Sequence, residues 1–292
     1  MNADRWQARA WLVDKPAGPT SHDIVRDVRR RLSRGTKVGH AGTLDPFATG
    51  LLIILAGRAT RLADRISTQP KAYRATIRCG ARSETGDPEG PVTTGGPVPE
   101  IDAIEDALTE LGTWTTQRVP AYSAVRVDGE RLYHRARRGE SVATPERSML
   151  VHELELVDYD RDACELTVEL RVSKGTYVRQ IAVDLGELLG CGAYCQALRR
   201  TAVGHLEIAD AVALDRVPYV APVPLTSLLA DISTAVVGPE DARALVHGRA
   251  IATAMTDGEV VITAHDGTLL AIAVAHDGLI RPSSVFVGPE YR

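Results

Sequence analysis

The chain has few cysteines, no long apolar run and no apolar segment at its N-terminus. Four cysteines in 292 residues are too few for a disulfide scaffold and indicate reduced thiols. The longest aliphatic run, residues 51–56, is far shorter than the roughly 18 residues that a membrane-spanning helix needs. Residues 1–9 lack the apolar stretch of a secretory signal. We therefore expect a cytoplasmic protein with no membrane segment.

The charge of the chain is unevenly distributed. Its composition, 44% hydrophobic and 25% charged, is typical of a soluble globular protein, and its net charge is −4. Residues 1–80, however, contain 15 basic and 6 acidic side chains, against 19 and 32 in the remainder. The densest basic stretch, residues 26–37, includes Arg29 and Arg30. It indicates a surface for a polyanion such as a nucleic acid, although a solvated helix face would have the same pattern.

Residue periodicity predicts a mixture of strands and helices without a regular alternation. Ile24, Val28 and Leu32 form one apolar stripe of a helix that Ser21 would cap. Residues 51–56 are apolar throughout, so periodicity cannot decide between strand and helix. The other predictions are strands at 11–13, 73–79, 151–157 and 164–172, the last two as a hairpin, helices at 101–111 and 177–189, and a long loop at 82–99. This mixture favours the α+β class.

The last part of the chain differs in composition. Prolines punctuate it at 218, 222 and 224, and a short helix is predicted at 239–246. Three Asp-Gly pairs, at 257–258, 266–267 and 277–278, lie between apolar runs and are typical of hairpin turns. We therefore predict two domains, a larger one of residues 1–225 and a small β-rich one of residues 226–292.

The loop of residues 39–50 combines three glycines with an exposed acid and an imidazole. Its glycines let the backbone approach a ligand closely. Asp45 precedes a proline, which keeps its backbone extended and presents its carboxylate, while His40 offers a second polar group. A structural turn in which Asp45 bonds its own backbone is the alternative. The loop lacks the Lys-Ser/Thr ending of a P-loop, which disfavours a nucleoside triphosphate site.

This loop resembles the catalytic motif of the TruB family of bacterial tRNA pseudouridine-55 synthases. Further blocks of the family follow in the same order between about residues 11 and 204. They are Asp-Lys-Pro-Ala-Gly-Pro-Thr-Ser at 14–21, Lys-Ala-Tyr at 71–73, the glycine-bounded loop 80–90, residues 120–133, Ser-Lys-Gly-Thr-Tyr-Val-Arg at 173–179 and Leu-Arg-Arg-Thr at 198–201. In loop 80–90, Ser83 and Glu84 replace the Thr and Asp of the family pattern.

The resemblance implies an α+β pseudouridine synthase fold with a mixed, mainly antiparallel sheet and a central cleft. Residues 226–292 resemble a small PUA-like domain. The family isomerises uridine 55 in the T loop of tRNA, breaking the N1–C1′ bond and forming a C5–C1′ bond after the base is flipped out. Asp45 matches the nucleophile of the family. Whether it attacks C1′ or acts through a glycal is left open by the sequence.

The resemblance also implies roles for other side chains. Arg179 matches the arginine that pairs with the nucleophile and would keep it ionised. Tyr73 matches the tyrosine that stacks on the target base and takes part in proton movement, and Tyr177 would share a face with Arg179 on an extended segment. The remaining substrate contacts are expected at His40, Lys174 and Leu198. Without the resemblance, His40 would be interpreted as a neutral histidine within a turn, Lys174 as one member of a structural ion pair, and Leu198 as a core residue.

Phosphate contacts are expected at Arg29, Arg30, Arg199 and Arg200, which would give affinity and register rather than base identity. No metal or organic cofactor is expected, and the spacing of Cys191 and Cys195 is not that of a zinc site. We expect a monomer that binds the T stem-loop of tRNA without an obligatory protein partner. The alternatives are a non-catalytic RNA-binding or tRNA-folding protein on this scaffold, and a guide-dependent synthase, which would carry basic tails that this sequence does not show.

Overall fold

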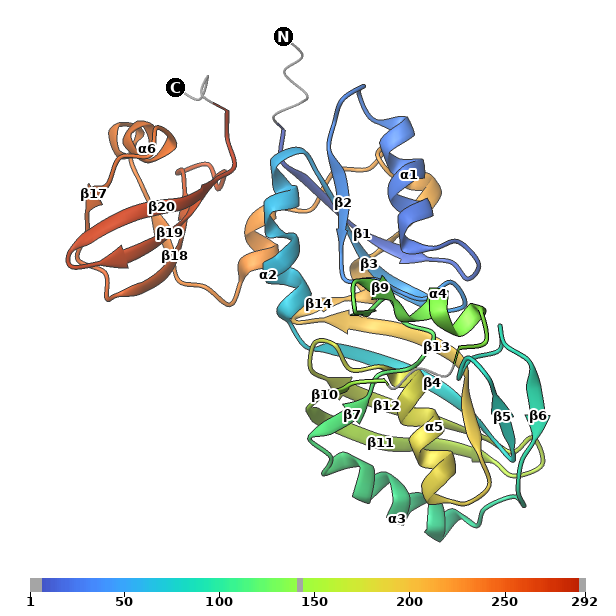
Figure 1. Cartoon of the computed structure of the whole chain (residues 1–292). Coiled ribbons are helices and arrows are strands. Elements are labelled where there is room, and N and C mark those ends of the chain that lie inside the picture. Colours follow the sequence, from blue (N-terminus) through green and yellow to red (C-terminus); the bar gives the residue numbers. More distant parts are fainter. Residues whose placement is uncertain (1–6, 141–143, 289–292) are drawn as a thin grey trace.

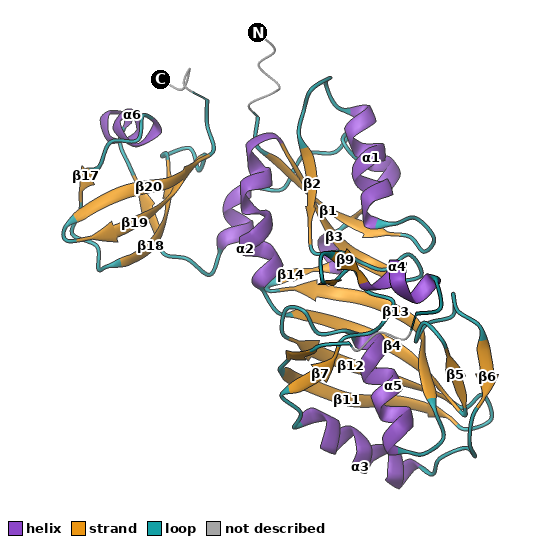
Figure 2. Cartoon of the chain, viewed as in Figure 1, coloured by secondary structure: helices purple, strands orange, loops and turns teal. Residues whose placement is uncertain are grey.

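The computed structural model describes residues 7–140 and 144–288 (Figures 1 and 2). Residues 1–6, which carry most of the segment considered as a secretory signal, lie outside this range. Within the described ranges, no helix combines the length and the apolarity that crossing a membrane requires.

A nine-stranded sheet forms the larger part of the molecule. Its strand order is β11-β12-β4-β13-β3-β1-β15, with β2 beside β3 and β14 beside β13. The β1–β15 and β3–β13 pairs are parallel and the other pairs are antiparallel. The strands are β1 (Arg9–Lys15), β2 (Val38–Ala41), β3 (Thr49–Ala56), β4 (Lys71–Cys79), β11 (Val151–Asp160), β12 (Glu165–Val172), β13 (Ala193–Val203), β14 (Leu206–Glu207) and β15 (Val212–Ala213). The predicted α+β class with a mixed, mainly antiparallel sheet is confirmed.

Strand β3 runs through the core with both faces covered. Leu51, Ile53 and Leu55 belong to one apolar cluster, whereas Leu52, Ile54 and Ala56 belong to another. A strand buried on both faces reads as a continuous apolar run. This explains why the sequence pattern of residues 51–56 did not distinguish a strand from a helix.

Helices cover both faces of the sheet. Side chains of α1 (Ser21–Arg31), α3 (Ile101–Gly112) and α5 (Val178–Leu188) pack into the first cluster, and those of the 3₁₀ helix η2 (Gly57–Leu62) and of α2 (Ala63–Thr68) pack into the second. The predicted cap of α1 is wrong by one residue. Thr20 is the N-cap: its hydroxyl accepts from the Asp23 N–H at 3.0 Å, and the Asp23 carboxylate accepts from the Thr20 N–H at 3.0 Å.

Three two-stranded sheets lie outside the large sheet. β5 (Ala81–Ser83) pairs with β6 (Val92–Thr94), inside the segment that we predicted as a loop. β7 (Thr116–Arg118) pairs with β10 (Glu146–Ser148). β8 (Arg126–Val127) pairs with β9 (Glu130–Arg131) and continues into α4 (Leu132–Arg137). The β5–β6 strands were missed because they are three residues long and largely exposed, so no apolar alternation marks them.

The C-terminal part forms a separate five-stranded sheet with one helix. Its strand order is β16-β18-β19-β20-β17, and α6 (Pro239–Val246) matches the predicted helix. Its strands are β16 (Thr234–Val236), β17 (Ile251–Ala252), β18 (Gly258–Thr263), β19 (Leu269–His276) and β20 (Leu279–Val285). The Asp-Gly pairs at 266–267 and 277–278 lie in hairpin connections, as predicted. The pair at 257–258 does not, because β17 pairs with β20 rather than with β18.

The C-terminal sheet packs against η2 and α2 (Figure 1). Phe286 is 2% exposed and belongs to the same apolar cluster as Leu62 and Ile66. Around it, Arg61 donates to the Val285 carbonyl at 2.7 Å and Arg65 forms an ion pair with Glu259. The two parts of the chain are therefore joined by a shared core as well as by the connecting segment.

Candidate active site

The first residue of α1, Ser21, anchors the loop that carries Asp45. The loop connects β2 to β3, and the Ser21 hydroxyl both accepts from the Leu44 N–H at 2.8 Å and donates to the Leu44 carbonyl at 3.0 Å. Two residues further on, the Pro46 carbonyl accepts from the Gly18 N–H at 2.9 Å. Ser21, predicted as a helix cap, thus fixes the residue next to Asp45 instead.

Lys15 provides a second anchor that the sequence did not reveal. Its side chain is fully buried, and Nζ donates to the carbonyls of Pro16, Pro19 and Pro46 at 2.8, 2.9 and 3.1 Å. These bonds use all three ammonium protons. Burial lowers the pKa of Lys15, and the nearby charge of Asp45 opposes that shift. The lysine therefore ties the segment before α1 to the Asp45 loop.

Arg200 supports the same loop from β13, and its predicted role as a phosphate contact is wrong. Only 1% of the residue is exposed, and its guanidinium donates to the carbonyls of Leu51, Thr43 and Gly42 at 2.7, 3.2 and 3.0 Å. A group buried in this way cannot reach a phosphate at the surface. Arg199 remains 41% exposed and makes two bonds to the Asp14 carboxylate, at 3.0 and 2.7 Å.

The backbones of β3 and β13 approach closely beside this arginine. Gly50 has φ +101°, and a Cβ placed on it would lie 2.3 Å from the Arg200 carbonyl oxygen. Both the positive φ and the lack of space require glycine at this position. The contact holds the end of the Asp45 loop against the strand that carries Leu198.

Arg179 lies beside Asp45, as the resemblance implied. Its Nε donates to the Asp45 Oδ2 at 2.8 Å, and the guanidinium also donates to the carbonyls of Thr85 and Tyr122 at 2.8 and 3.0 Å. A second carboxylate, that of Asp87, lies 3.0 Å from Nη1. Arg179 therefore joins the Asp45 loop, loop 80–90 and the start of the segment that leads to α4.

The two carboxylates at Arg179 differ in exposure. The side chain of Asp45 is 36% exposed, whereas that of Asp87 is 5% exposed. Asp87 also accepts from the Thr85 hydroxyl at 2.5 Å and from the Glu89 N–H at 3.1 Å. Asp45 is thus the carboxylate that an incoming substrate can reach. The sequence had placed Asp87 in a family block, but its pairing with Arg179 depends on the folded arrangement of two distant segments.

Tyr177 and Arg179 do not share an extended segment, which corrects the same-face prediction. Tyr177 is the N-cap residue of α5, and Arg179 lies in the first turn of that helix. The backbone of Tyr177 is held by the buried Gln117, which accepts from its N–H at 2.9 Å and donates to its carbonyl at 3.1 Å. Gln117 was missed because nothing in the sequence connects it with residue 177.

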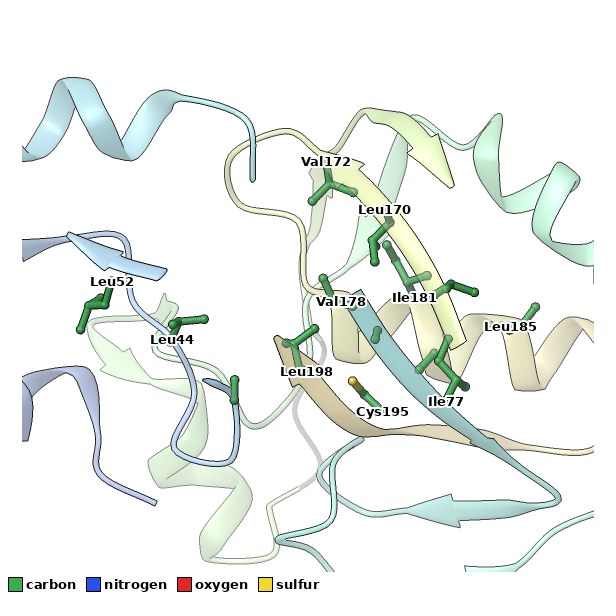
Figure 3. Packing of buried hydrophobic residues seen from close by; sticks show 14 of the residues in the cluster. Leu44, Leu52, Ile77, Leu170, Val172, Val178, Ile181, Leu185, Cys195 and Leu198 are labelled. Atoms are coloured by element: carbon green, nitrogen blue, oxygen red, sulfur yellow. The ribbon is translucent and has the colours of Figure 1, made fainter. Parts of the chain in front are cut away.

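Tyr73 and Leu198 lie on neighbouring strands in the centre of the sheet. In the β4–β13 pair, Ala75 faces Leu198 and Tyr73 faces Arg200. Leu198 is 7% exposed and belongs to the same cluster as Leu44 and Val178, which Figure 3 shows around it. Tyr73 is partly buried and packs against that cluster. The structure therefore places Leu198 close to the Asp45 loop.

Three basic side chains near the site differ in their surroundings. His40 lies on β2, where burial and then the Arg200 charge lower its pKa, and its Nδ1 has no hydrogen-bond partner among the described residues. Lys71 is 6% exposed, and burial lowers its pKa to about 8. Lys174 is exposed. The lowered pKa agrees with the alternative interpretation of His40 as a neutral histidine, but Nδ1 does not make the bond within the turn that this alternative includes.

A basic segment that the sequence analysis did not single out begins beside Arg179. We call residues 123–138 the arm; it contains the β8–β9 hairpin and α4 (Figure 1). It has four exposed arginines, Arg126, Arg131, Arg137 and Arg138. A count of basic residues along the chain would have found it. The exposed Arg29 and Arg30 lie in the last turn of α1, a separate surface.

The same fold occurs in solved structures of two macromolecular complexes. The structure titled "Structure of H/ACA RNP bound to a substrate RNA containing 2'-deoxyuridine" superposes with a TM-score of 0.72 at 20% identity, covering 99% of this chain and 87% of that chain. A Cbf5-Nop10-Gar1 complex gives the same TM-score at 22% identity, with the same coverage. At these identities the likeness concerns the fold alone.

Sequence comparison identifies the family. Residues 29–178 match the model of the TruB family pseudouridylate synthase N-terminal domain, and residues 179–236 match that of the tRNA pseudouridylate synthase B C-terminal domain. A tRNA pseudouridine synthase B of Thermobifida fusca is 42% identical over 95% of this chain and 98% of its own length. One of Cupriavidus metallidurans is 37% identical over 93% and 91%. The chain belongs to the TruB family of pseudouridylate synthases, and it is an isomerase that acts on tRNA.

Proposed function

We propose that this enzyme converts uridine 55 of the tRNA T loop to pseudouridine with Asp45 as its nucleophile. The observation that carries this proposal is the exposed Asp45 carboxylate, held at Oδ2 by the buried Arg179. The bond from Arg179 Nε is charge-assisted and fixes the orientation of the Asp45 carboxylate. Addition at C1′ and a glycal route both use a carboxylate at this position.

The reaction needs no change in composition, only a change in which base atom is bonded to C1′. The N1–C1′ bond breaks, the base turns, the C5–C1′ bond forms, and the proton on C5 leaves while N1 gains one. We propose that Tyr73 stacks on the flipped base and takes part in this proton movement. Leu198 would pack against the base, because it is an apolar side chain close to the Asp45 loop. These steps are carried by side chains of the chain itself.

We propose that the substrate is held by the T stem-loop. His40, Lys174 and Tyr177 would contact the flipped nucleotide and its neighbours, and Arg29, Arg30 and Arg199 would contact phosphates. Phosphate contacts give affinity and register, whereas the shape of the T loop gives specificity. We further propose that the enzyme is a cytoplasmic monomer that needs no partner protein, metal or organic cofactor. Its catalytic domain would comprise residues 1–225 and a PUA-like domain residues 226–292.

Pseudouridine mapping of a tRNA transcript tests the proposal. The wild-type protein, alone and without added cofactor, should produce pseudouridine at position 55. Asp45→Asn should abolish turnover and keep tRNA affinity within about tenfold, because it removes the nucleophile and leaves the binding surface. Turnover by Asp45→Asn would exclude Asp45 as the nucleophile. Tight binding without product from the wild type would favour the RNA-binding or guide-dependent alternatives.

A further inference from the structure

Two cysteines that are distant in the sequence have their thiols in contact. Cys79 is the last residue of β4, and Cys191 lies in the turn that precedes β13. Each is 1% exposed, and their side chains are hydrogen-bonded to each other. The mechanism proposed above uses neither thiol, so the pair is a feature that the isomerase reaction leaves unexplained.

The backbone around the pair fixes the two thiols in place. The Gly80 N–H donates to the Gly192 carbonyl at 3.0 Å, so the residues that directly follow Cys79 and Cys191 are bonded to each other. On the other side, the Gly96 N–H donates to the Cys191 carbonyl at 2.7 Å. Cysteines that are far apart or point away from each other cannot be bridged without backbone movement. These two are in contact and held there, so a bridge needs little rearrangement.

The surroundings of the two thiols differ. Cys79 donates the hydrogen bond, which lowers the pKa of Cys191, and a backbone bond from Gly80 acts in the same direction. The same contact, together with burial, raises the pKa of Cys79. A cation also lies beside Cys191, because a Cβ on the adjacent Gly192 would be 2.7 Å from Arg82 Nη1. Since the thiolate is the nucleophilic form of cysteine, Cys191 is the reactive member of the pair.

We propose that Cys79 and Cys191 are an oxidation-sensitive pair, which hydrogen peroxide converts to an intramolecular disulfide. The Cys191 thiolate attacks one peroxide oxygen; an S–O bond forms, the O–O bond breaks, and the leaving hydroxide takes up a proton to become water. The Cys79 sulfur then attacks the Cys191 sulfur. An S–S bond forms, the S–O bond breaks, and hydroxide leaves with the Cys79 proton as a second water. Two electrons pass from the sulfurs to the peroxide, and burial of both thiols favours such a small oxidant.

The disulfide would close the base of a segment that contributes to the active site. Residues 80–96 carry Thr85 and Asp87, which both contact Arg179. Because the ends of this segment are already bonded through the backbone, the bridge would leave those contacts in place. A cross-link over a long stretch of chain stabilises a protein mainly by constraining its unfolded state. Oxidation should therefore raise the urea midpoint of the protein and preserve its activity.

Peptide mapping after peroxide treatment tests the proposal. Trypsin releases Cys79 in residues 79–82 and Cys191 in residues 180–199, which also contain Cys195. The protein is treated with peroxide, its remaining thiols are alkylated in denaturant, and the digest is analysed by mass spectrometry. We expect residues 79–82 linked to residues 180–199, and two of the four thiols should be lost. In Cys195→Ala the same linked fragments identify Cys191 as the partner.

The variants test the order of the two steps. Dimedone, which labels sulfenic acids, should mark Cys191 in Cys79→Ala after peroxide, and it should leave Cys79 unmarked in Cys191→Ala. Neither variant should gain a higher urea midpoint on oxidation, whereas the wild type should. Cys164→Ala is the matched control, because Cys164 is the partly exposed cysteine and lies outside the pair. It should form the linked fragments as the wild type does.

Three results would overturn the proposal. The first is a peroxide-treated wild type that keeps four free thiols or accumulates sulfinic acids without linked fragments. The second is a bridge that involves Cys164 or Cys195 instead, and the third is dimedone labelling of Cys79 in Cys191→Ala. None of these readouts requires turnover. They stand apart from the proposed function, which fails only if Asp45→Asn retains turnover or the untreated wild type forms no pseudouridine.

Discussion

Two carboxylates share one arginine at the centre of the site, and their surroundings give them different roles. Asp87 is buried and accepts two further hydrogen bonds, so it balances the Arg179 charge in the absence of substrate. Asp45 is exposed and contacts Arg179 at one oxygen, so it is available to react. The contrast predicts that the two residues respond differently to the same substitution.

Asp87→Asn should lower the free energy of unfolding by about 3 kcal/mol, because it removes the buried partner of a buried guanidinium and leaves Arg179 with only the more exposed Asp45 as counter-charge. Asp45→Asn changes an exposed carboxylate and should lower it by less than about 1 kcal/mol. Urea denaturation of the two variants measures both values. Equal losses in the two variants would show that burial does not distinguish these carboxylates.

Lys71 predicts a dependence of stability on pH. Burial holds its pKa at about 8 in the folded protein, below its ordinary 10.5. Between these pH values the unfolded chain binds more protons than the folded protein, so the free energy of unfolding should rise with pH. The contribution is up to about 3 kcal/mol. Urea denaturation from pH 7 to 10.5 should show a rise in the wild type that exceeds that in Lys71→Met; parallel curves would contradict the assignment.

Single residues also show where sequence reasoning stops. Arg199 and Arg200 are adjacent and chemically identical, and both were predicted to contact phosphate. Alternation along β13 leaves one exposed and buries the other among loop carbonyls. Asp45 and Arg179 were found because family motifs mark them. Lys15, Gln117 and the Asp87 pairing depend on contacts between distant segments, and no local pattern encodes them.

At the scale of elements, two neighbouring hydroxyls at the start of α1 have different roles: that of Thr20 caps the helix, and that of Ser21 holds the Asp45 loop. Thr20→Ala should lower the free energy of unfolding by about 1 kcal/mol through loss of the cap, with kcat unchanged. Ser21→Ala should lower kcat about tenfold, because the Leu44 N–H loses its acceptor and the Asp45 loop loses its anchor. Urea denaturation and steady-state kinetics of both variants test this. An unchanged kcat in Ser21→Ala would mean that Lys15 and Gly18 are sufficient to hold the loop.

Elements were predictable where one face is buried and the other is not. In β12, Leu166, Val168 and Leu170 are buried in alternation, and the strand was recognised. Helices α3, α5 and α6 were recognised because each has one apolar face opposite a polar one, or a clear N-terminal signal. The failures are β3, which is buried on both faces, and β5–β6, which have no buried face. Strand pairing was also not predictable at residues 257–258. The Asp-Gly pair there was predicted to be a hairpin turn, but Gly258 begins β18, and the preceding strand β17 pairs with β20 instead.

At the scale of the whole molecule, the shared apolar cluster predicts that the two parts of the chain unfold together. All three tryptophans lie at positions 6, 11 and 114, outside the C-terminal part, so their fluorescence reports unfolding elsewhere. Phe286→Ala should lower the stability seen by this fluorescence by about 3 kcal/mol. Val274→Ala, at a side chain 45% exposed on β19, should change it by less than about 0.5 kcal/mol.

Equilibrium denaturation followed by fluorescence and by far-ultraviolet circular dichroism provides the comparison. Coincident transitions are expected for the wild type and for both variants. A fluorescence transition that does not move in Phe286→Ala would show that the C-terminal sheet unfolds independently, and that the shared cluster contributes little to the stability of the larger part.

The close approach of β3 to β13 limits which substitutions the active-site loop accepts. A side chain at position 50 would overlap the Arg200 backbone, whereas Gly18 and Gly35, also at positive φ, have no atom within 4 Å of an added Cβ. A saturation library of this enzyme selected for activity would therefore return glycine alone at position 50. At positions 18 and 35 it would tolerate Asn and Asp, which adopt this backbone conformation most readily among the other residues. Mutational tolerance would thus reveal the strand contact next to the Asp45 loop, without any structure.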